Sequence, residues 1–400
     1  MRFRDQIFWT LIVQGGGALS LLLAISILAR YLGPVQQGIF SASKVEIEFI
    51  GSLAMLGLPQ SIFYYINSSK ISIFRAKELA GFFGIFAGVV ALIYSNSVIR
   101  WSFLDSILFA LATLSFVWFM CLRSVILSIS TSKTFNFITA LPQFLVLAYA
   151  LYAVKVGYVD NFNSSLCLAL CYATAVILCL RIIFILNSDK SKIINLYREE
   201  PFLNVIHFGV ASGIVAICSN ASILLSIHGV RNSLGSSSLG IFLFGCSLTQ
   251  GLLVPINYAL PLLLKRWMNK FDTQIVLWVG MIVFFLIFTI SMLLCLFQHF
   301  FALDKFLRSY SPMLDFLWIL VLVASIDAFE KIISVATNAK GAPWLLASSE
   351  IFRLAIVGLG VFYLPIKQTS DVVWIIFAAS IVSASIKTTL FNKLSSKNYG

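Results

Sequence analysis

Apolar segments long enough to cross a lipid bilayer recur along the whole chain. A membrane-spanning helix takes about 20 predominantly apolar residues. Charged and turn-forming residues divide the sequence into apolar segments near residues 7–28, 38–66, 79–97, 105–128, 135–155, 163–187, 204–228, 238–263, 274–298, 313–338, 343–365 and 370–390. Of the 400 residues, 60% are apolar and 11% are charged, whereas soluble domains carry about 25% charged residues. We therefore predict an integral membrane protein whose connections are too short to hold a folded domain.

The spanning segments are expected to be helices. Backbone polar groups inside hydrocarbon must be hydrogen-bonded within the protein, and the sequence lacks the period-2 alternation of a barrel strand. The predicted fold class is therefore all-α, with twelve transmembrane helices. Pro59, Pro142, Pro255 and Pro261 fall inside these segments and are expected to kink their helices.

The formal net charge is +12, which in a soluble protein would suggest nucleic-acid binding. Here the basic residues stand between apolar segments, where they act first as topology signals. More of them fall on the side of the N-terminus than on the opposite side, and Lys387 belongs to the first group in this division. Both termini are therefore predicted to be cytoplasmic, and no nucleic-acid partner is expected.

The two halves of the chain begin with the same glycine pattern. The run LGPVQQGIF from Leu32 to Phe40 recurs as LGSSSLGIF from Leu234 to Phe242, and the same offset of 202 positions carries Leu58-Pro59 onto Leu260-Pro261. The motif positions are Gly33, Pro34, Gly38, Pro59, Gly235, Gly240 and Pro261. Because each half holds six segments, both halves enter the membrane from the same side, as parallel repeats do. We predict a six-helix lobe over residues 1–190, a cytoplasmic linker over 191–203 and a second lobe over 204–400.

The residues around the first copy of this motif resemble a known family. Arg30-Tyr31-Leu32-Gly33-Pro34, Gly38-Ile39-Phe40-Ser41 and Leu56-Gly57-Leu58-Pro59-Gln60-Ser61, followed by Tyr64-Tyr65, are similar to the opening helix pair of the Wzx-type O-antigen and polysaccharide flippases. Those flippases belong to the multidrug/oligosaccharidyl-lipid/polysaccharide (MOP) exporter superfamily. The motifs cover about residues 28–66, and the twelve segments with their half-chain repeat extend the resemblance over the whole chain.

The resemblance implies a fold and a cargo. Similar proteins are bacterial inner-membrane proteins in which two six-helix lobes form a MATE-like, V-shaped central cavity. They move undecaprenyl-pyrophosphate-linked oligosaccharide repeat units from the cytoplasmic to the periplasmic leaflet. The partners expected on this basis are the lipid-linked glycan, membrane lipids, and a polysaccharide polymerase with its chain-length regulator.

Ionisable residues inside the apolar segments are the candidates for function, because a charge facing lipid is costly and usually lines a cavity or pairs with a neighbour. They are Lys44, Glu46, Glu48, Arg123, Arg181, Asp327, Glu330, Lys331, Glu350 and Arg353. Helical spacing allows the pairs Lys44 with Glu48, Asp327 with Lys331, and Glu350 with Arg353. One interpretation is that these pairs only hold helices together, while Arg123 and Arg181 reach the nearby membrane interface.

The alternative interpretation gives these residues a part in transport. A charged headgroup cannot cross hydrocarbon unaided and needs a wet, partly cationic path. We predict that Arg30, Lys44, Arg123, Lys331 and Arg353 line such a cavity and bind pyrophosphate or acidic sugars, since guanidinium groups donate bidentately to phosphate oxygens. Of these five, only Arg30 lies on the family motif.

Asp327 and Glu330 are the candidates for ion coupling, with H⁺ or Na⁺ as the ion. An intramembrane carboxylate can bind and release a proton during a transport cycle. Lys331 beside Asp327 instead favours a fixed ion pair or a sodium site.

Two other classes remain open. A multidrug or cation antiporter of the same fold is disfavoured by the basic residues in the segments. A membrane polysaccharide polymerase or ligase usually needs a large external loop or a His/Asp/Arg group near one interface, and neither is evident. We predict a transporter that is not an enzyme and uses neither a metal nor another cofactor.

Overall fold

A computed structural model shows the fold of the protein. It describes residues 3–67, 69–99, 101–157, 162–188, 201–269, 272–297, 308–340 and 342–396. Within these ranges the chain forms helices and no strand, which confirms the predicted all-α class.

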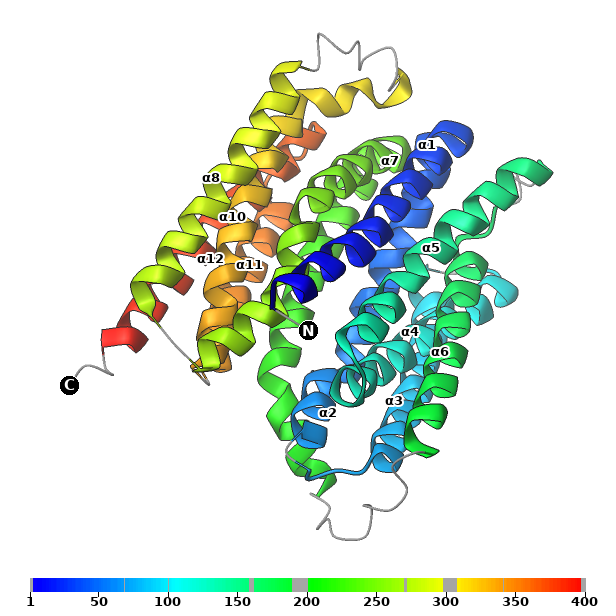
Figure 1. The fold of residues 1–400 in the computed structure, drawn as a ribbon. Helices are drawn as coiled ribbons and strands as arrows, with labels where there is room; N and C mark the ends of the chain where they lie inside the picture. The colour runs from blue at the N-terminus through cyan, green and yellow to red at the C-terminus, as the bar shows by residue number, and fades with distance from the viewer. Residues whose placement is uncertain are drawn as a thin grey trace. The chain divides into compact units, whose positions relative to one another are not determined.

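The helices follow the predicted segments closely (Figure 1). They are α1 (Phe3–Met55), α2 (Leu58–Asn67), α3 (Ile73–Tyr94) with a π-helical extension (Ser95–Ile99), α4 (Phe103–Ile129), α5 (Ser132–Val156), α6 (Ser164–Ser188), α7 (Phe202–Asn269), α8 (Thr273–Phe297), a 3₁₀ turn (Arg308–Met313), α10 (Leu314–Ala339), α11 (Pro343–Tyr363) and α12 (Thr369–Ser396).

Two of these elements each hold two helices. Inside α1 the backbone leaves the helical conformation at Gly33 (φ 73°, ψ 176°), and inside α7 it does so at Gly235 (φ 84°, ψ 176°). This region of backbone conformation is open almost only to glycine. The repeated Leu-Gly motif therefore marks the same one-residue break in both halves, where the sequence suggested short connecting loops. Counted on either side of these glycines, with α2 continuing the second helix, the described chain has the twelve predicted helices.

The second helix of each half differs at its proline. Leu56 and Gly57 have positive φ angles of 44° and 74° and end the helix there, so Pro59 stands in the first turn of α2. A proline is well accommodated in a first turn, and the expected kink at Pro59 is replaced by a complete break. In the second half the helix continues to Asn269, beyond Pro261.

Nine helices of the described chain are long and apolar enough to cross a membrane, and two of these, Phe8–Met55 and Gly209–Val254, contain a glycine break. The protein is thus a multi-pass membrane protein. The long helix that is too charged to meet this criterion is α10, which carries Asp327, Glu330 and Lys331.

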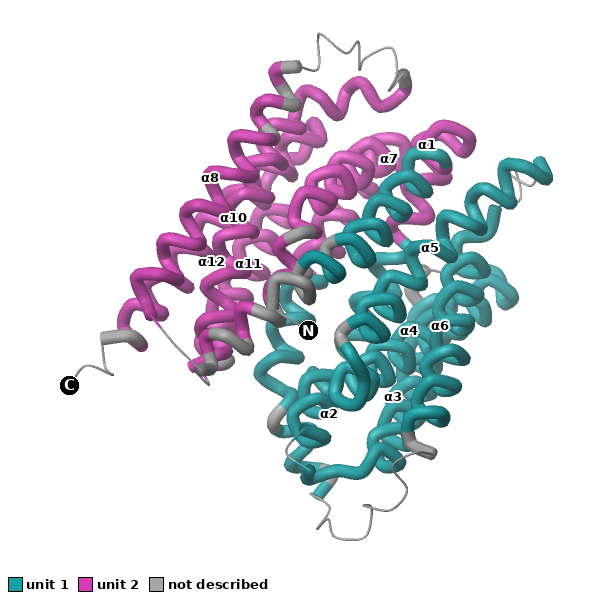
Figure 2. Tube along the Cα trace, in the orientation of Figure 1, with its two compact units in different colours: residues 1–27, 43–220 teal, residues 28–42, 221–400 magenta. Residues whose placement is uncertain are grey.

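The chain forms two compact units (Figure 2). Unit 1 comprises Met1–Ile27 and Ser43–Asn220, and unit 2 comprises Leu28–Ala42 and Ala221–Gly400. Unit 2 therefore includes the segment around Gly33, and unit 1 includes the first part of α7. The predicted linker falls largely on residues 189–200, outside the described ranges, so the division into lobes at 191–203 stays a prediction.

In unit 1, α4 is the central helix and packs against α2, α3, α5 and α6. A neutral polar chain links α1 to α5: Gln14 donates to Asn136, which donates to Thr10 over 2.7 Å. All three side chains are buried. Hydrogen bonds of this kind hold helices together where water is absent.

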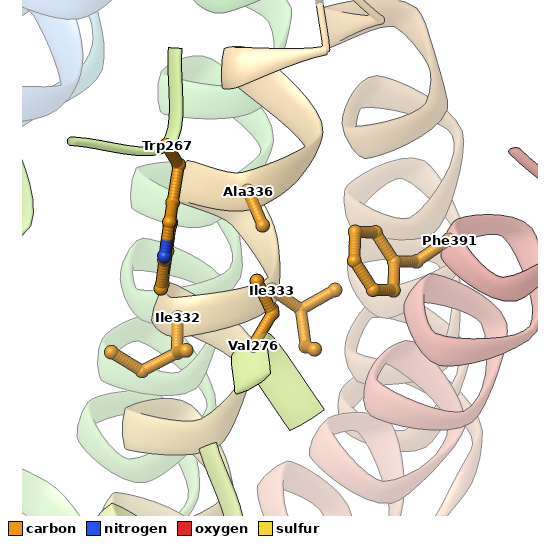
Figure 3. Packing of buried hydrophobic residues seen from close by; sticks show 6 residues of the cluster. All are labelled: Trp267, Val276, Ile332, Ile333, Ala336 and Phe391. Atoms are coloured by element: carbon orange, nitrogen blue, oxygen red, sulfur yellow. The ribbon is translucent and has the colours of Figure 1, made fainter. Parts of the chain in front are cut away.

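In unit 2, α10 has the corresponding central place and packs against α8, α11 and α12. One apolar cluster lies at its C-terminal half and joins Trp267 of α7, Val276 of α8, Ile332, Ile333 and Ala336 of α10, and Phe391 of α12 (Figure 3). Ile332 and Ile333 directly follow Glu330 and Lys331 in the sequence. The packing of this cluster therefore fixes the part of α10 that carries the charges.

Candidate functional site

Three helices of unit 2 bring ionisable side chains together in its interior. Asp327, Glu330 and Lys331 stand within five residues on α10, and Glu350 and Arg353 are three residues apart on α11. Residues three and four apart lie close together on a helix surface, so the charges of each helix stand near one another. The third helix, α12, contributes Lys387. We call Asp327, Glu330, Lys331, Glu350, Arg353 and Lys387 the ionic cluster.

Arg353 joins α11 to α10. Its Nη2 lies 3.0 Å from Oδ1 of Asp327, and its Nη1 lies 3.9 Å from Oε2 of Glu330. The side chains of Asp327 and Arg353 are 12% and 14% exposed, so this ion pair is largely removed from solvent. A guanidinium in this place holds two carboxylates of one helix face at once.

Lys387 joins α12 to both other helices. Its Nζ lies 2.5 Å from Oε2 of Glu330 and 2.5 Å from Oε1 of Glu350. Ser383, one turn earlier on α12, donates to the same Glu330 oxygen over 3.3 Å. Glu330, Glu350 and Lys387 are each at most 5% exposed. A buried charge is tolerated only where partners of this kind compensate for the lost solvation.

The pairing within the ionic cluster differs from the sequence prediction. Lys331 donates to Oδ1 of Asn257 on α7 over 2.7 Å instead of pairing with Asp327. Arg353 pairs with Asp327 and not with Glu350, three residues away on its own helix. Helical spacing shows which residues share a face, but the partner across the helix interface depends on how the helices pack.

Lys387 is the member that the residue pattern misplaces. The count of basic residues for topology groups it with those outside the segments, although residue 387 falls within the segment 370–390, and it is buried well inside α12. A signal for it is present in the sequence, because Ser380, Ser383 and Lys387 recur at helical spacing and form one polar face of this segment.

The other predicted cavity residues lie elsewhere. Lys44 forms the predicted pair with Glu48, at 3.0 Å, with both side chains 31% exposed. Arg123 is half-buried on α4, and Arg30 is exposed three residues before Gly33. Lys44 and Arg123 belong to unit 1, whereas Arg30, Lys331 and Arg353 belong to unit 2. The gathering of these five side chains around one cavity stays a prediction.

Close approach of two repeat-equivalent glycines is the second feature of unit 2. A Cβ atom on Gly38 would stand 3.0 Å from the backbone of Gly240, and one on Gly240 would stand 1.8 Å from the carbonyl oxygen of Pro34. Larger residues would force these helices apart. Of the two glycine pairs in the sequence repeat, Gly38 and Gly240 therefore mark a close approach of the two helices, while Gly33 and Gly235 mark the breaks.

No family model matches the chain, and no curated protein matches it in sequence. Solved structures do match, over nearly the full length. A multidrug resistance MATE family transporter of the MOP superfamily in its inward-facing conformation has a TM-score of 0.65 at 14% identity, covering 95% of this chain and 96% of its own. A mutant of the Vibrio cholerae MATE transporter VcmN has a TM-score of 0.70 at 12% identity, covering 97% and 96%.

The chain has the MATE fold. A third MATE structure, in complex with MaL6, has a TM-score of 0.68 at 13% identity and covers 99% of this chain and 97% of its own. At 12–14% identity the likeness concerns the fold, while the cargo has to be argued from the residues.

Proposed function

We propose that this protein is a membrane transporter that flips an undecaprenyl-pyrophosphate-linked oligosaccharide from the cytoplasmic to the periplasmic leaflet of a bacterial inner membrane. The observation that carries the transporter assignment is the MATE fold over at least 95% of the chain. The motif from Arg30 to Ser61, which resembles that of the Wzx-type flippases, supports the choice of a lipid-linked glycan.

Charge supports an anionic cargo. The chain has a net charge of +12, and cations favour the approach of a pyrophosphate group. Arg30 is exposed next to the break at Gly33, on the family motif. It can donate to phosphate oxygens without first breaking a buried ion pair. Arg353 and Lys331, by contrast, are engaged with Asp327 and Asn257.

Alternating access is the proposed mode of transport. A MATE transporter of this fold is known in inward-facing and in outward-facing conformations, and the chain matches both, with TM-scores of 0.65 and 0.66. Binding of cargo on one side and of a coupling ion on the other would shift the population between two such states. Asp327 and Glu330 are the proposed coupling residues, and no covalent catalysis is part of this mechanism.

The MATE fold also supports a second candidate, a multidrug or cation antiporter, because one matching structure is a multidrug resistance transporter. The two functions predict different phenotypes in a deletion strain. Loss of a flippase causes lipid-linked repeat units to accumulate in the inner leaflet and removes surface glycan. Loss of an antiporter raises sensitivity to cationic drugs and leaves the glycan intact.

The test is complementation of such a strain by the full chain. Restored surface glycan with unchanged drug tolerance supports the flippase. Restored drug tolerance with unaltered lipid-linked glycans would contradict it. A reporter fused after Gly400 checks the proposed topology. A reporter that works only in the cytoplasm should be active there, and one that works only outside the membrane should be inactive.

A further inference from the structure

Glu330 and Glu350 both contact one cation, the ammonium group of Lys387. The two glutamates stand on different helices, α10 and α11, and each has one oxygen 2.5 Å from Nζ of Lys387. Ser383 Oγ bonds the same Glu330 oxygen. The ammonium therefore lies among two carboxylate oxygens, next to a hydroxyl, from three helices.

The ionic cluster is balanced. Its three acids, Asp327, Glu330 and Glu350, meet three bases, Lys331, Arg353 and Lys387. Arg353 forms an ion pair with Asp327 and lies near Glu330, and Lys331 donates a hydrogen bond to Asn257 on α7. The sequence of α8, the remaining helix against α10, contains no charged residue. Within the described ranges, Lys387 is thus the base in contact with Glu350, and without it the ionic cluster would have three acids against two bases.

Each of the two carboxylates at this position has a free acceptor atom. Oε1 of Glu330 and Oε2 of Glu350 are buried and have no hydrogen-bond donor among the described residues. Both glutamates are at least 95% buried. Carboxylate oxygens are ligands that hard metal cations prefer. The surroundings of the Lys387 ammonium thus have the chemistry of a cation site, with the lysine in the place of the ion.

We propose that Lys387 is a tethered cation that fills a monovalent cation site formed by Glu330 and Glu350, so that this cluster does not take Na⁺ in the intact protein. An external cation must either displace the ammonium or arrive as a proton on one of the carboxylates. The consequence for transport, that Na⁺ is not the ion coupled through this cluster, rests on the ion-coupled function proposed above. The binding property itself does not.

The test uses purified full-length protein and needs no transport assay. Thermal unfolding is followed by the fluorescence of the eight tryptophans, in NaCl and in choline chloride of equal concentration. We expect the wild-type Tm to be equal in the two salts. In Lys387→Ala the site is vacated, and NaCl should raise Tm by about 3 °C over choline chloride, because a ligand that binds only the folded state stabilises it.

Matched variants separate site binding from general salt effects. Lys387→Arg keeps the positive charge and should show no difference between the salts. In Lys387→Ala combined with Glu350→Gln one ligand is lost, and the sodium-specific shift should disappear. Lys387→Gln, which keeps a polar side chain of similar length, serves in place of Lys387→Ala if that variant does not fold, with the same expected shift.

Two results would overturn the proposal. One is a sodium-specific rise in the wild-type Tm that Glu350→Gln removes, since the site would then be open to Na⁺ despite the lysine. The other is a folded Lys387→Ala or Lys387→Gln protein that melts at the same temperature in both salts. Either result leaves the flippase assignment untouched, because that assignment is judged by the accumulation of lipid-linked glycan.

Discussion

Gly240 lies so close to Pro34 that a Cβ atom on Gly240 would stand 1.8 Å from the Pro34 carbonyl oxygen. Pro34 opens the second helix of the first half, and Gly240 lies in the second helix of the second half. The repeat thus brings its own equivalent segments into backbone contact, and the required residue at this contact is glycine.

Gly240→Ala should therefore strongly reduce the yield of folded protein. Inserting a methyl group into a tight contact costs about 1–3 kcal/mol. Here the added methyl would meet a backbone atom, which cannot move aside as a flexible side chain can, so we expect a cost at the upper end of that range. Gly358→Ala is the control, because its Cβ would meet only Leu225 at 3.6 Å. Equal Tm values for the two variants in detergent would contradict the close approach.

The breaks at Gly33 and Gly235 make a separate prediction. Both glycines have φ angles above 70° with ψ near 176°, a conformation that costs another residue about 1–3 kcal/mol. Gly33→Ala and Gly235→Ala should each lower Tm although neither Cβ would meet an atom within 4 Å. Gly15→Ala, on a helical stretch with equally open surroundings, should be neutral or stabilising. A Gly33→Ala protein as stable as the wild type would show that the backbone at position 33 has another conformation.

The Arg353–Asp327 pair should behave as a buried ion pair. Arg353→Ala leaves Asp327 without its guanidinium and should cost about 3–5 kcal/mol. Arg353→Gln with Asp327→Asn removes both charges together, and we expect it to recover much of this loss. The measurement is a double-mutant cycle on thermal unfolding, formed by Arg353→Gln, Asp327→Asn and the variant that carries both. Additive losses in the double variant would mean that the two side chains do not interact.

Arg30 allows a test of cargo binding without loss of the fold. Its side chain is exposed, so Arg30→Ala should leave the protein in the membrane at its normal level while surface glycan falls sharply. Arg231→Ala is the matched control, because Arg231 is also exposed and stands next to position 232, the repeat equivalent of Arg30. Normal glycan in the Arg30→Ala strain would remove this arginine from the proposed path.

The segments were predictable because hydrocarbon imposes a simple rule. Each crossing needs a long apolar run with its backbone bonded internally, so α4 at Phe103–Ile129 could be placed from the sequence at 105–128. The glycines at 33 and 235 were recognisable as a repeat, since glycine has few substitutes at such a backbone conformation. That each marks a one-residue break, and not a loop, depended on φ and ψ values that a residue pattern does not contain.

The pairing of charges could not be predicted in the same way. Spacing along α10 and α11 predicted pairs within each helix, Asp327 with Lys331 and Glu350 with Arg353. The structure pairs them across helices and adds Lys387 from α12.

The composition and the spacing of apolar segments thus determined that this is a twelve-helix membrane protein with an internal repeat, because burial in lipid acts on each segment separately. Only the tertiary structure decided which buried charge neutralises which, because that depends on the distance between side chains far apart in the chain.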